Sequence, residues 1–281
     1  MSTRARVIAP NTIATADGVH LFYRDWNPSG RRTVLFVAGW SLPSDSWGYQ
    51  MMALSRQGLR CVAFDRRGHG RSSDPGGGYD LDTLADDIAA VIEALDLRAL
   101  TLVGHSMGCN EIVRYLSRHR SERVARVALL GAMTPGVSLG AANPNGIDPS
   151  LLIQFREQQL LRDFPLWIED NIEPFVPGAN AGMKAWLAQM ALGTSLQALH
   201  DCNLVVQAAE MSEEMRRIDL PVLLIAGDRD VSAPLGLTAR RSAELLPHAR
   251  LRVLEGAAHG MFLTHVERVN AELLEFIPGR G

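Results

Sequence analysis

The chain alternates short apolar runs with longer segments whose apolar residues recur every three or four positions. An alternating apolar and polar run at 19–23 predicts an edge strand, whereas uniformly apolar runs predict strands buried on both faces. The uniformly apolar runs are 33–38, 60–64, 99–103 and 124–130. The clearest helical pattern covers 81–95 behind Asp80, a residue type that caps helices. Strands that alternate with helices predict a parallel sheet with helices on both faces.

This alternation lapses between residues 134 and 218. A passage rich in Gly, Pro and Asn comes first, at 136–149, and helical or aromatic segments follow it. These segments are 151–161, 167–172 and 183–192. The strand pattern resumes with the apolar runs 222–226 and 251–254, and a final helix is predicted from 261 to 276. The middle of the chain therefore reads as a helical insertion into an α/β domain.

A chain of 281 residues has room for one large domain, or for one domain with an insertion. We predict an α/β core made of residues 1–133 and 219–281, with a mostly parallel sheet. Residues 134–218 are predicted to form a helical cap inserted after strand 6. The cap is expected over the carboxyl edge of the sheet, where open α/β sheets place their ligands.

Composition narrows the classes of partner. The net charge of −3 gives no basis for binding nucleic acid or an anionic membrane surface. No run is long enough to span a bilayer, and residues 1–6 lack the apolar stretch of a signal peptide. The cysteines are odd in number and widely separated, so they match neither a disulfide framework nor a zinc site. We therefore expect a cytoplasmic protein.

The most informative motif is Gly104-His105-Ser106-Met107-Gly108, which lies between a predicted strand and a predicted helix. A turn this sharp leaves no room for a Cβ on its flanking residues, so both are glycine. The residue at the apex is forced into a cleft at the start of the helix, where a hydroxyl can attack a carbonyl. The motif also arises by chance, so Ser106 is a candidate nucleophile only if partners exist.

A serine hydroxyl needs an adjacent base, which a carboxylate in turn orients. In a strand–turn–helix architecture the chain order is Ser, then Asp or Glu, then His. Asp228 and Asp230 follow the next-to-last predicted strand, and His259 follows the last one. Both turns lie at the sheet edge where Ser106 emerges. His259 is the favoured base, ahead of His265 on the final helix.

The second requirement is an oxyanion hole, which needs two N–H donors where negative charge develops. The residue after the nucleophile, Met107, supplies one backbone donor. The loop after the third strand supplies the other, and Trp40 is the candidate because Gly39 allows a close approach of the backbone. The Trp40 indole can also simply pack in the cleft.

With these residues in place, the chain resembles the α/β-hydrolase superfamily over nearly its whole length. The resemblance is closest to the branch of cofactor-free (non-haem) chloroperoxidases, arylesterases and perhydrolases. It is carried by Gly39-Trp-Ser-Leu-Pro-Ser-Asp-Ser-Trp47, Phe64-Asp-Arg-Arg-Gly-His-Gly-Arg-Ser-Ser73, Tyr79-Asp-Leu-Asp-Thr-Leu-Ala-Asp-Asp87 and the serine motif. It implies the α/β-hydrolase fold, a Ser-His-Asp triad, and no metal or organic cofactor.

The resemblance selects Asp230 as the acid, because the family's Gly-x-x-Asp pattern falls on residues 227–230. Some members place the acid after the sixth strand, where the first carboxylate here is Asp148, a weaker alternative. The chain also departs from the family. Ala38 stands where a histidine is usual, Ser41 where a proline is usual, and Cys109 where a further glycine is frequent.

Together these observations predict a serine hydrolase of carboxylic esters or lactones. The aromatic and apolar insertion predicts an apolar pocket for a small to medium apolar substrate. Candidate pocket residues are Gly39, His105, Met133, Phe155, Trp167, Trp186 and Val231. Alternatives are perhydrolysis with halide oxidation, carbon–carbon bond hydrolysis on the same triad, and a ligand receptor of the same fold. A homo-oligomer is left open.

Overall fold

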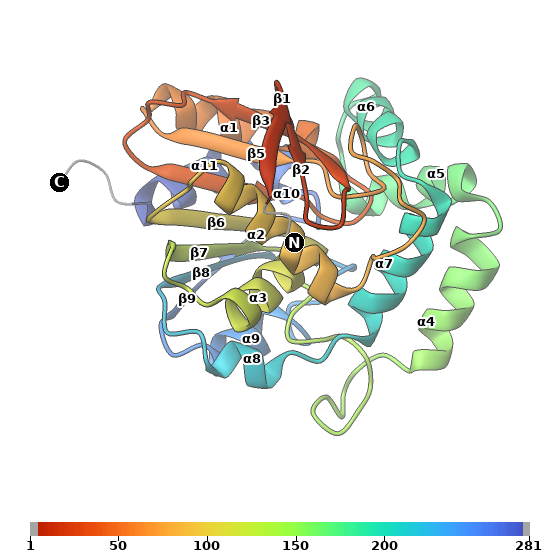
Figure 1. Ribbon diagram of the computed structural model, residues 1–281. Helices are drawn as coiled ribbons and strands as arrows, with labels where there is room; N and C mark the ends of the chain where they lie inside the picture. The colour runs from red at the N-terminus through yellow and green to blue at the C-terminus, as the bar shows by residue number, and fades with distance from the viewer. Residues whose placement is uncertain (1–4, 278–281) are drawn as a thin grey trace.

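The computed structural model describes residues 5–277, and Figure 1 shows a central sheet with helices on both sides. Residues 1–4 and 278–281 lie outside the described residues, and with them the ends of the predicted core and most of the segment 1–6. Within the described range the sheet has nine strands in the order β1-β2-β3-β5-β4-β6-β7-β8-β9. The strands are β1 Arg6–Ala9, β2 Thr12–Ala14, β3 His20–Trp26, β4 Thr33–Val37, β5 Arg60–Phe64, β6 Leu100–His105, β7 Val124–Leu130, β8 Val222–Gly227 and β9 Ala249–Leu254.

The predicted α/β architecture is confirmed, with two corrections. Strands β4 to β9 pair in parallel, whereas β1, β2 and β3 are antiparallel to their neighbours. β3 was predicted as an edge strand, but it lies between β2 and β5. The short strands β1 and β2 cover that edge, and they are too short to give a clear pattern in the sequence. Because these two strands change the numbering, the insertion follows β7 rather than a sixth strand. The loop that carries Trp40 follows β4 rather than a third strand.

Side chains of each buried strand alternate between two hydrophobic layers, as the pleat of a β-strand requires. In β4, Leu35 and Val37 face a layer that includes α2 and α3, whereas Val34 and Phe36 face a layer that includes α1 and α11. The flanking helices are α1 Gly48–Arg56, α2 Leu81–Ala94, α3 Met107–His119, α9 Ala239–Leu245, α10 Met261–Thr264 and α11 Val266–Phe276. The predicted final helix is thus two helices, α10 and α11.

Helix α2 begins where the sequence indicates. The Asp80 side chain accepts a hydrogen bond from the Thr83 backbone N–H at 3.0 Å, which satisfies a donor that the helix itself leaves free. Its apolar residues are buried at helical spacing, as predicted.

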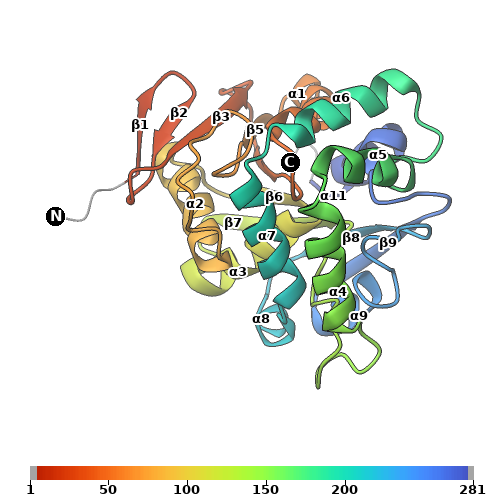
Figure 2. The ribbon, with the colours of Figure 1, turned by 90° about the vertical axis from the view of Figure 1, so that its right-hand side faces the viewer.

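Helices fill most of the stretch between β7 and β8. They are α4 Pro149–Phe155, a π-helical turn Arg156–Leu160, α5 Phe164–Phe175, α6 Ala181–Leu192, α7 Leu196–Ala208 and α8 Ser212–Arg216. Figures 1 and 2 both place α4, α5, α6 and α7 together at one end of the sheet. Helix α7 was not predicted, because the buried residues Asn203 and Gln207 interrupt its apolar pattern. Across residues 5–277 no helix has both the length and the apolar character needed to cross a membrane.

The loop after β5 contains a buried histidine that makes stability depend on pH. His69 Nδ1 lies 3.0 Å from the carbonyl oxygen of Arg67. Burial, reinforced by the nearby Arg66 guanidinium, lowers the pKa of His69 from 6.5 to about 3. Between these two values the unfolded chain binds a proton that the folded protein does not. Stability is therefore full above pH 6.5 and falls as the pH drops toward 3.

We expect the wild type to lose about 1.4 kcal/mol of unfolding free energy, relative to His69→Gln, for each pH unit below roughly 6.5. Urea unfolding of both proteins at about pH 7 and about pH 5 measures the difference. Parallel pH dependence in the two proteins would contradict the burial of a neutral histidine at this position.

Candidate active site

Ser106 lies at the apex of the turn between β6 and α3, with the strained backbone angles φ 52° and ψ −122°. The flanking glycines are required by close contacts. A Cβ on Gly108 would lie 2.5 Å from the carbonyl oxygen of Val37, and one on Gly104 would lie 2.8 Å from Ile112 Cδ1. The turn therefore packs directly against β4 and its own helix, and this packing holds the hydroxyl in place.

Three side chains from distant parts of the chain meet at this turn. His259 Nε2 lies 2.8 Å from Ser106 Oγ, and His259 Nδ1 lies 2.7 Å from Asp230 Oδ2. The second Asp230 oxygen accepts the backbone N–H groups of Ser232 at 3.0 Å and Ala233 at 2.7 Å. The carboxylate is thus anchored on one side and directed at the imidazole on the other. All three triad candidates are at least nine-tenths buried.

The competing candidates lie elsewhere. Asp228 accepts a hydrogen bond from the Gly256 backbone N–H at 2.7 Å, so it joins two loops and does not contact the histidine. His265 Nδ1 lies 3.0 Å from Thr264 Oγ1 at the start of α11. The structure therefore brings Asp230 and His259, rather than Asp228 or His265, to the serine.

Two backbone donors are available beside the serine. Met107 is the first residue of α3, where N–H groups have no acceptor within the helix. For the Trp40 N–H, no acceptor is found among the described residues. Both residues line the cavity above Ser106. The Trp40 indole Nε1 donates to the carbonyl oxygen of Leu199 at 3.1 Å, so this loop is attached to α7.

A buried ion pair behind the loop was missed by sequence reasoning. Arg66 and Glu111 are 3% and 1% exposed, and Arg66 Nε donates to Glu111 Oε1 at 2.8 Å. Arg66 Nη2 also donates to the carbonyl oxygen of Ala38 at 2.6 Å. Burial raises the pKa of Glu111, and the Arg66 charge opposes that shift. The guanidinium therefore holds the loop at Ala38, the position where the resemblance implies a histidine. The sequence signal for this pair was Glu111, a charged residue on the buried side of α3.

His105 precedes the nucleophile and is buried beside the catalytic candidate His259. Its Nε2 lies 3.0 Å from the carbonyl oxygen of His259, and since a carbonyl only accepts, this nitrogen carries the proton. Burial, together with the nearby His259, lowers the pKa of His105 well below its usual value, so the ring is neutral. A Cβ on Gly39 would lie 2.5 Å from His105 Nδ1. His105 thus lies between the loop that carries Gly39 and Trp40 and the loop that carries His259, and it contacts both.

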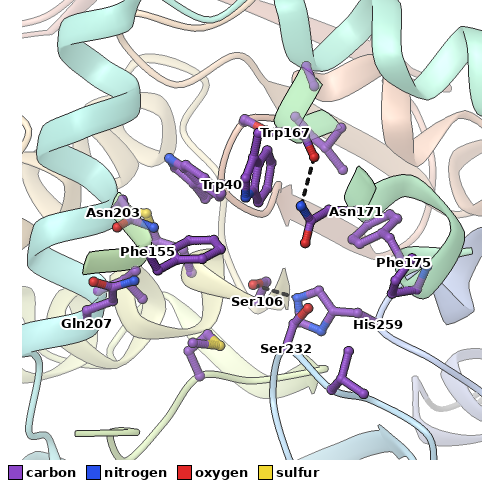
Figure 3. Close-up of a pocket in the computed structure, with 18 of the residues that line it drawn as sticks. Trp40, Ser106, Phe155, Trp167, Asn171, Phe175, Asn203, Gln207, Ser232 and His259 are labelled. Atoms are coloured by element: carbon purple, nitrogen blue, oxygen red, sulfur yellow. Dashed lines mark hydrogen bonds between the residues drawn. The ribbon is translucent and has the colours of Figure 1, made fainter. Parts of the chain in front are cut away.

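A cavity of about 350 Å³ opens above Ser106, between the sheet and the inserted helices (Figure 3). Of the predicted pocket residues, five line it: His105, Met133, Phe155, Trp167 and Val231. Gly39 and Trp186 do not. Gly39 is packed against His105, and the Trp186 ring meets Tyr49 edge-on with centroids 6.3 Å apart.

Most of the cavity wall is apolar, with a few amides and hydroxyls placed around it. The polar lining residues that sequence reasoning missed are Ser41, Asn171, Asn203, Gln207 and Ser232. Asn171 Nδ2 donates to the carbonyl oxygen of Trp167 at 2.8 Å, a contact drawn in Figure 3. Their sequence surroundings are ordinary, and only the folded arrangement brings them to the cavity, Asn171 from α5, Asn203 and Gln207 from α7, and the two serines from loops after β4 and β8.

In the described part of the chain, no group of three or more His, Cys, Asp or Glu side chains could hold a metal ion. The three cysteines are buried and free, and burial raises the pKa of Cys109. The absence of a cofactor stays a prediction from the resemblance.

A family model, related sequences and solved structures all match this chain over at least half of its length. Residues 32–181 match the family model described as alpha/beta hydrolase fold. The chain is 37% identical over 273 residues to a non-heme chloroperoxidase of Streptomyces lividans, covering 95% of this chain and 99% of that protein. It is 34% identical over 272 residues to a bifunctional esterase/perhydrolase of Acinetobacter calcoaceticus, covering 94% and 98%. Among solved structures, an esterase from Exiguobacterium antarcticum superposes with a TM-score of 0.90 at 26% identity, covering 95% and 98%.

The Arg66–Glu111 pair yields a stability prediction. We expect Arg66→Met to cost about 3–5 kcal/mol of unfolding free energy, because it leaves the Glu111 carboxylate buried without its partner. The double variant Arg66→Met/Glu111→Leu should be less destabilised than Arg66→Met, because neither charge remains. Urea unfolding of Arg66→Met, Glu111→Leu, the double variant and the wild type measures these values. A double variant that is as unstable as the sum of the two single variants contradicts the coupling.

Proposed function

The chain belongs to the α/β hydrolase family, and from this premise we propose that it is a serine hydrolase of carboxylic esters or lactones. The observation that carries the proposal is the unbroken series of hydrogen bonds from Ser106 through His259 to Asp230 on the floor of an apolar cavity. A hydroxyl, an imidazole and an anchored carboxylate in this order are the parts that acyl transfer requires. The substrate we favour is small to medium in size and mainly apolar.

In the proposed reaction, Ser106 Oγ attacks the substrate carbonyl while His259 Nε2 takes its proton. Asp230 holds the imidazole in the tautomer with a proton on Nδ1, and its negative charge stabilises the imidazolium that forms. His259 then gives the proton to the leaving alcohol. Water next attacks the acyl-enzyme with His259 again as the base, which releases the acid and restores Ser106.

The negative oxygen of the tetrahedral intermediate would be bound by the backbone N–H groups of Met107 and Trp40. Gly39 and Arg66 support this role, the first by close packing on His105 and the second by its hydrogen bond to Ala38. The donors belong to the backbone, so they do not require the histidine that Ala38 replaces.

Residues 134–218 act as the proposed cap over this site. Helices α4, α5 and α7 contribute much of the cavity lining, which is mostly apolar. Such a wall favours apolar acyl or alcohol groups over sugars or phosphates, because burial of strongly hydrated groups is costly without partners. A cytoplasmic location and a possible homo-oligomer stay predictions.

A second candidate function is perhydrolysis, in which hydrogen peroxide replaces water as the attacker of the acyl-enzyme. The observation that favours it is the naming of relatives as a non-heme chloroperoxidase and an esterase/perhydrolase. The peracid formed would then oxidise halide in solution. Hydrolysis and perhydrolysis share every step up to the acyl-enzyme, so the same residues serve both.

Replacement of the proposed nucleophile gives the first functional prediction. Ser106→Ala should lower kcat for p-nitrophenyl esters by at least ~10⁴-fold, because no acyl-enzyme can form. Release of p-nitrophenol measures the rate, and circular dichroism with thermal unfolding checks that the variant is folded. Near-full activity in a folded Ser106→Ala protein contradicts the assignment.

The peroxide reaction gives a further prediction. Halogenation of monochlorodimedone, measured with acetate, bromide and hydrogen peroxide, should require both the carboxylate and Ser106, because the peracid comes from the acyl-enzyme. It should therefore disappear without acetate and in Ser106→Ala. Halogenation that persists in the variant contradicts a shared intermediate.

A further inference from the structure

One end of the cavity carries two amide side chains on the same face of α7. Asn203 and Gln207 are one helical turn apart, line the cavity and are 4% and 9% exposed. Their buried neighbours on this helix are apolar, among them Cys202 and Val206. Figure 3 shows the two amides on one side of Ser106 and His259 on the other. The cavity is thus polar at a place away from the reacting groups.

Gln207 has a fixed orientation. Arg156 Nη1 lies 3.2 Å from Gln207 Oε1, and a guanidinium can only donate hydrogen bonds. The amide oxygen must therefore face Arg156, which leaves the amide NH₂ to face away from it. Among the described residues no acceptor is found for this NH₂ group. Gln207 consequently offers hydrogen-bond donors to whatever occupies the cavity.

A buried arginine does this orienting, and the backbone is distorted where it lies. Arg156 is 5% exposed and begins the π-helical turn Arg156–Leu160, in which it and Leu160 are the buried residues. Such turns are rare and frequently mark functional sites. Its Nε is paired with Glu157 at 3.1 Å. Two of the guanidinium nitrogens are therefore bonded, and Arg156, which does not itself line the cavity, acts on it through Gln207.

Asn203 complements this arrangement. Its Oδ1 is buried without a hydrogen-bond partner, and no partner for Nδ2 is found in the part of the chain that the structure describes. An unpaired amide in an apolar wall is unfavourable unless a ligand satisfies it. No hydrogen bond among the described residues fixes the Asn203 amide, so rotation about its terminal bond can exchange the positions of Nδ2 and the buried Oδ1. In the rotated orientation Oδ1 can accept a hydrogen bond beside the donors of Gln207.

We propose that Asn203 and Gln207 form a subsite for an uncharged group that both accepts and donates a hydrogen bond, namely a hydroxyl or a secondary amide. The group accepts from Gln207 Nε2 and donates to Asn203 Oδ1. The inference rests on the proposed function: the substrate is an ester or lactone with an apolar middle and this polar group away from the scissile carbonyl. A carboxylate is disfavoured by Asn203 Oδ1 and the apolar wall, and a cation by Arg156.

The test compares p-nitrophenyl alkanoates of increasing chain length with their ω-hydroxy counterparts, which are nearly equal in size. At the best length the wild type should prefer the hydroxy ester. Gln207→Leu and Asn203→Leu should lower kcat/KM for that ester by about 10- to 100-fold, mainly through KM, and should spare or improve the apolar ester. The matched control is Gln197→Leu on the exposed face of α7, which should leave the preference unchanged.

The subsite is overturned if the wild type shows no preference for the hydroxy ester. It is also overturned if that preference is unaltered in both leucine variants. An ω-carboxylate ester that is turned over better than the hydroxy ester also overturns it. Failure of the proposed function is recognised separately, because then no ester is hydrolysed. In that case the subsite is tested by binding. Ser106→Ala protein is titrated with the primary amides of the ω-hydroxy and unsubstituted acids, and tryptophan fluorescence reports the binding. Tighter binding of the hydroxy amide that Gln207→Leu abolishes supports the subsite, and equal binding overturns it.

Discussion

The close approach of the Gly108 backbone to the end of β4 is the contact on which the rest of the site depends. Because a Cβ there would lie 2.5 Å from the Val37 carbonyl oxygen and 2.8 Å from that of Ala38, the first turn of α3 touches the loop that carries Trp40 directly. This contact places Ser106, the N–H of Met107 and the N–H of Trp40 in one small region. The packing around the turn also sustains the positive φ of Ser106, a strained backbone conformation.

Around this contact, buried polar groups hold the loops rather than take part in the chemistry we propose. Arg66 fixes the Ala38 carbonyl from one side, and neutral His105 binds the His259 carbonyl from the other. Gly131 leaves space for the histidine, since a Cβ there would lie 3.2 Å from His259 Nδ1. Electrostatic catalysis requires donors that are fixed before the reaction begins, and this scaffold provides that condition.

Local rules predicted the sheet, the serine turn and the loops that carry Asp230 and His259, whereas the choice of Asp230 over Asp228 came from the resemblance to the α/β hydrolases. Apolar runs mark buried strands, glycines mark a close backbone approach, and functional loops follow the carboxyl ends of parallel strands. The pocket was harder to predict. Trp186 packs outward on Tyr49, and α7 was missed because its buried face includes Asn203 and Gln207. Which aromatic or amide side chain reaches a cavity depends on tertiary packing, which no local pattern records.

The central claim is that Ser106 is a nucleophile made reactive by His259. Mass spectrometry of the protein after reaction with a fluorophosphonate tests it most directly, because the reagent forms a bond only to an activated hydroxyl. The account predicts a single adduct on Ser106, formed at least ~10³-fold more slowly in His259→Gln. An adduct on another residue, or labelling at an unchanged rate without the histidine, would contradict it.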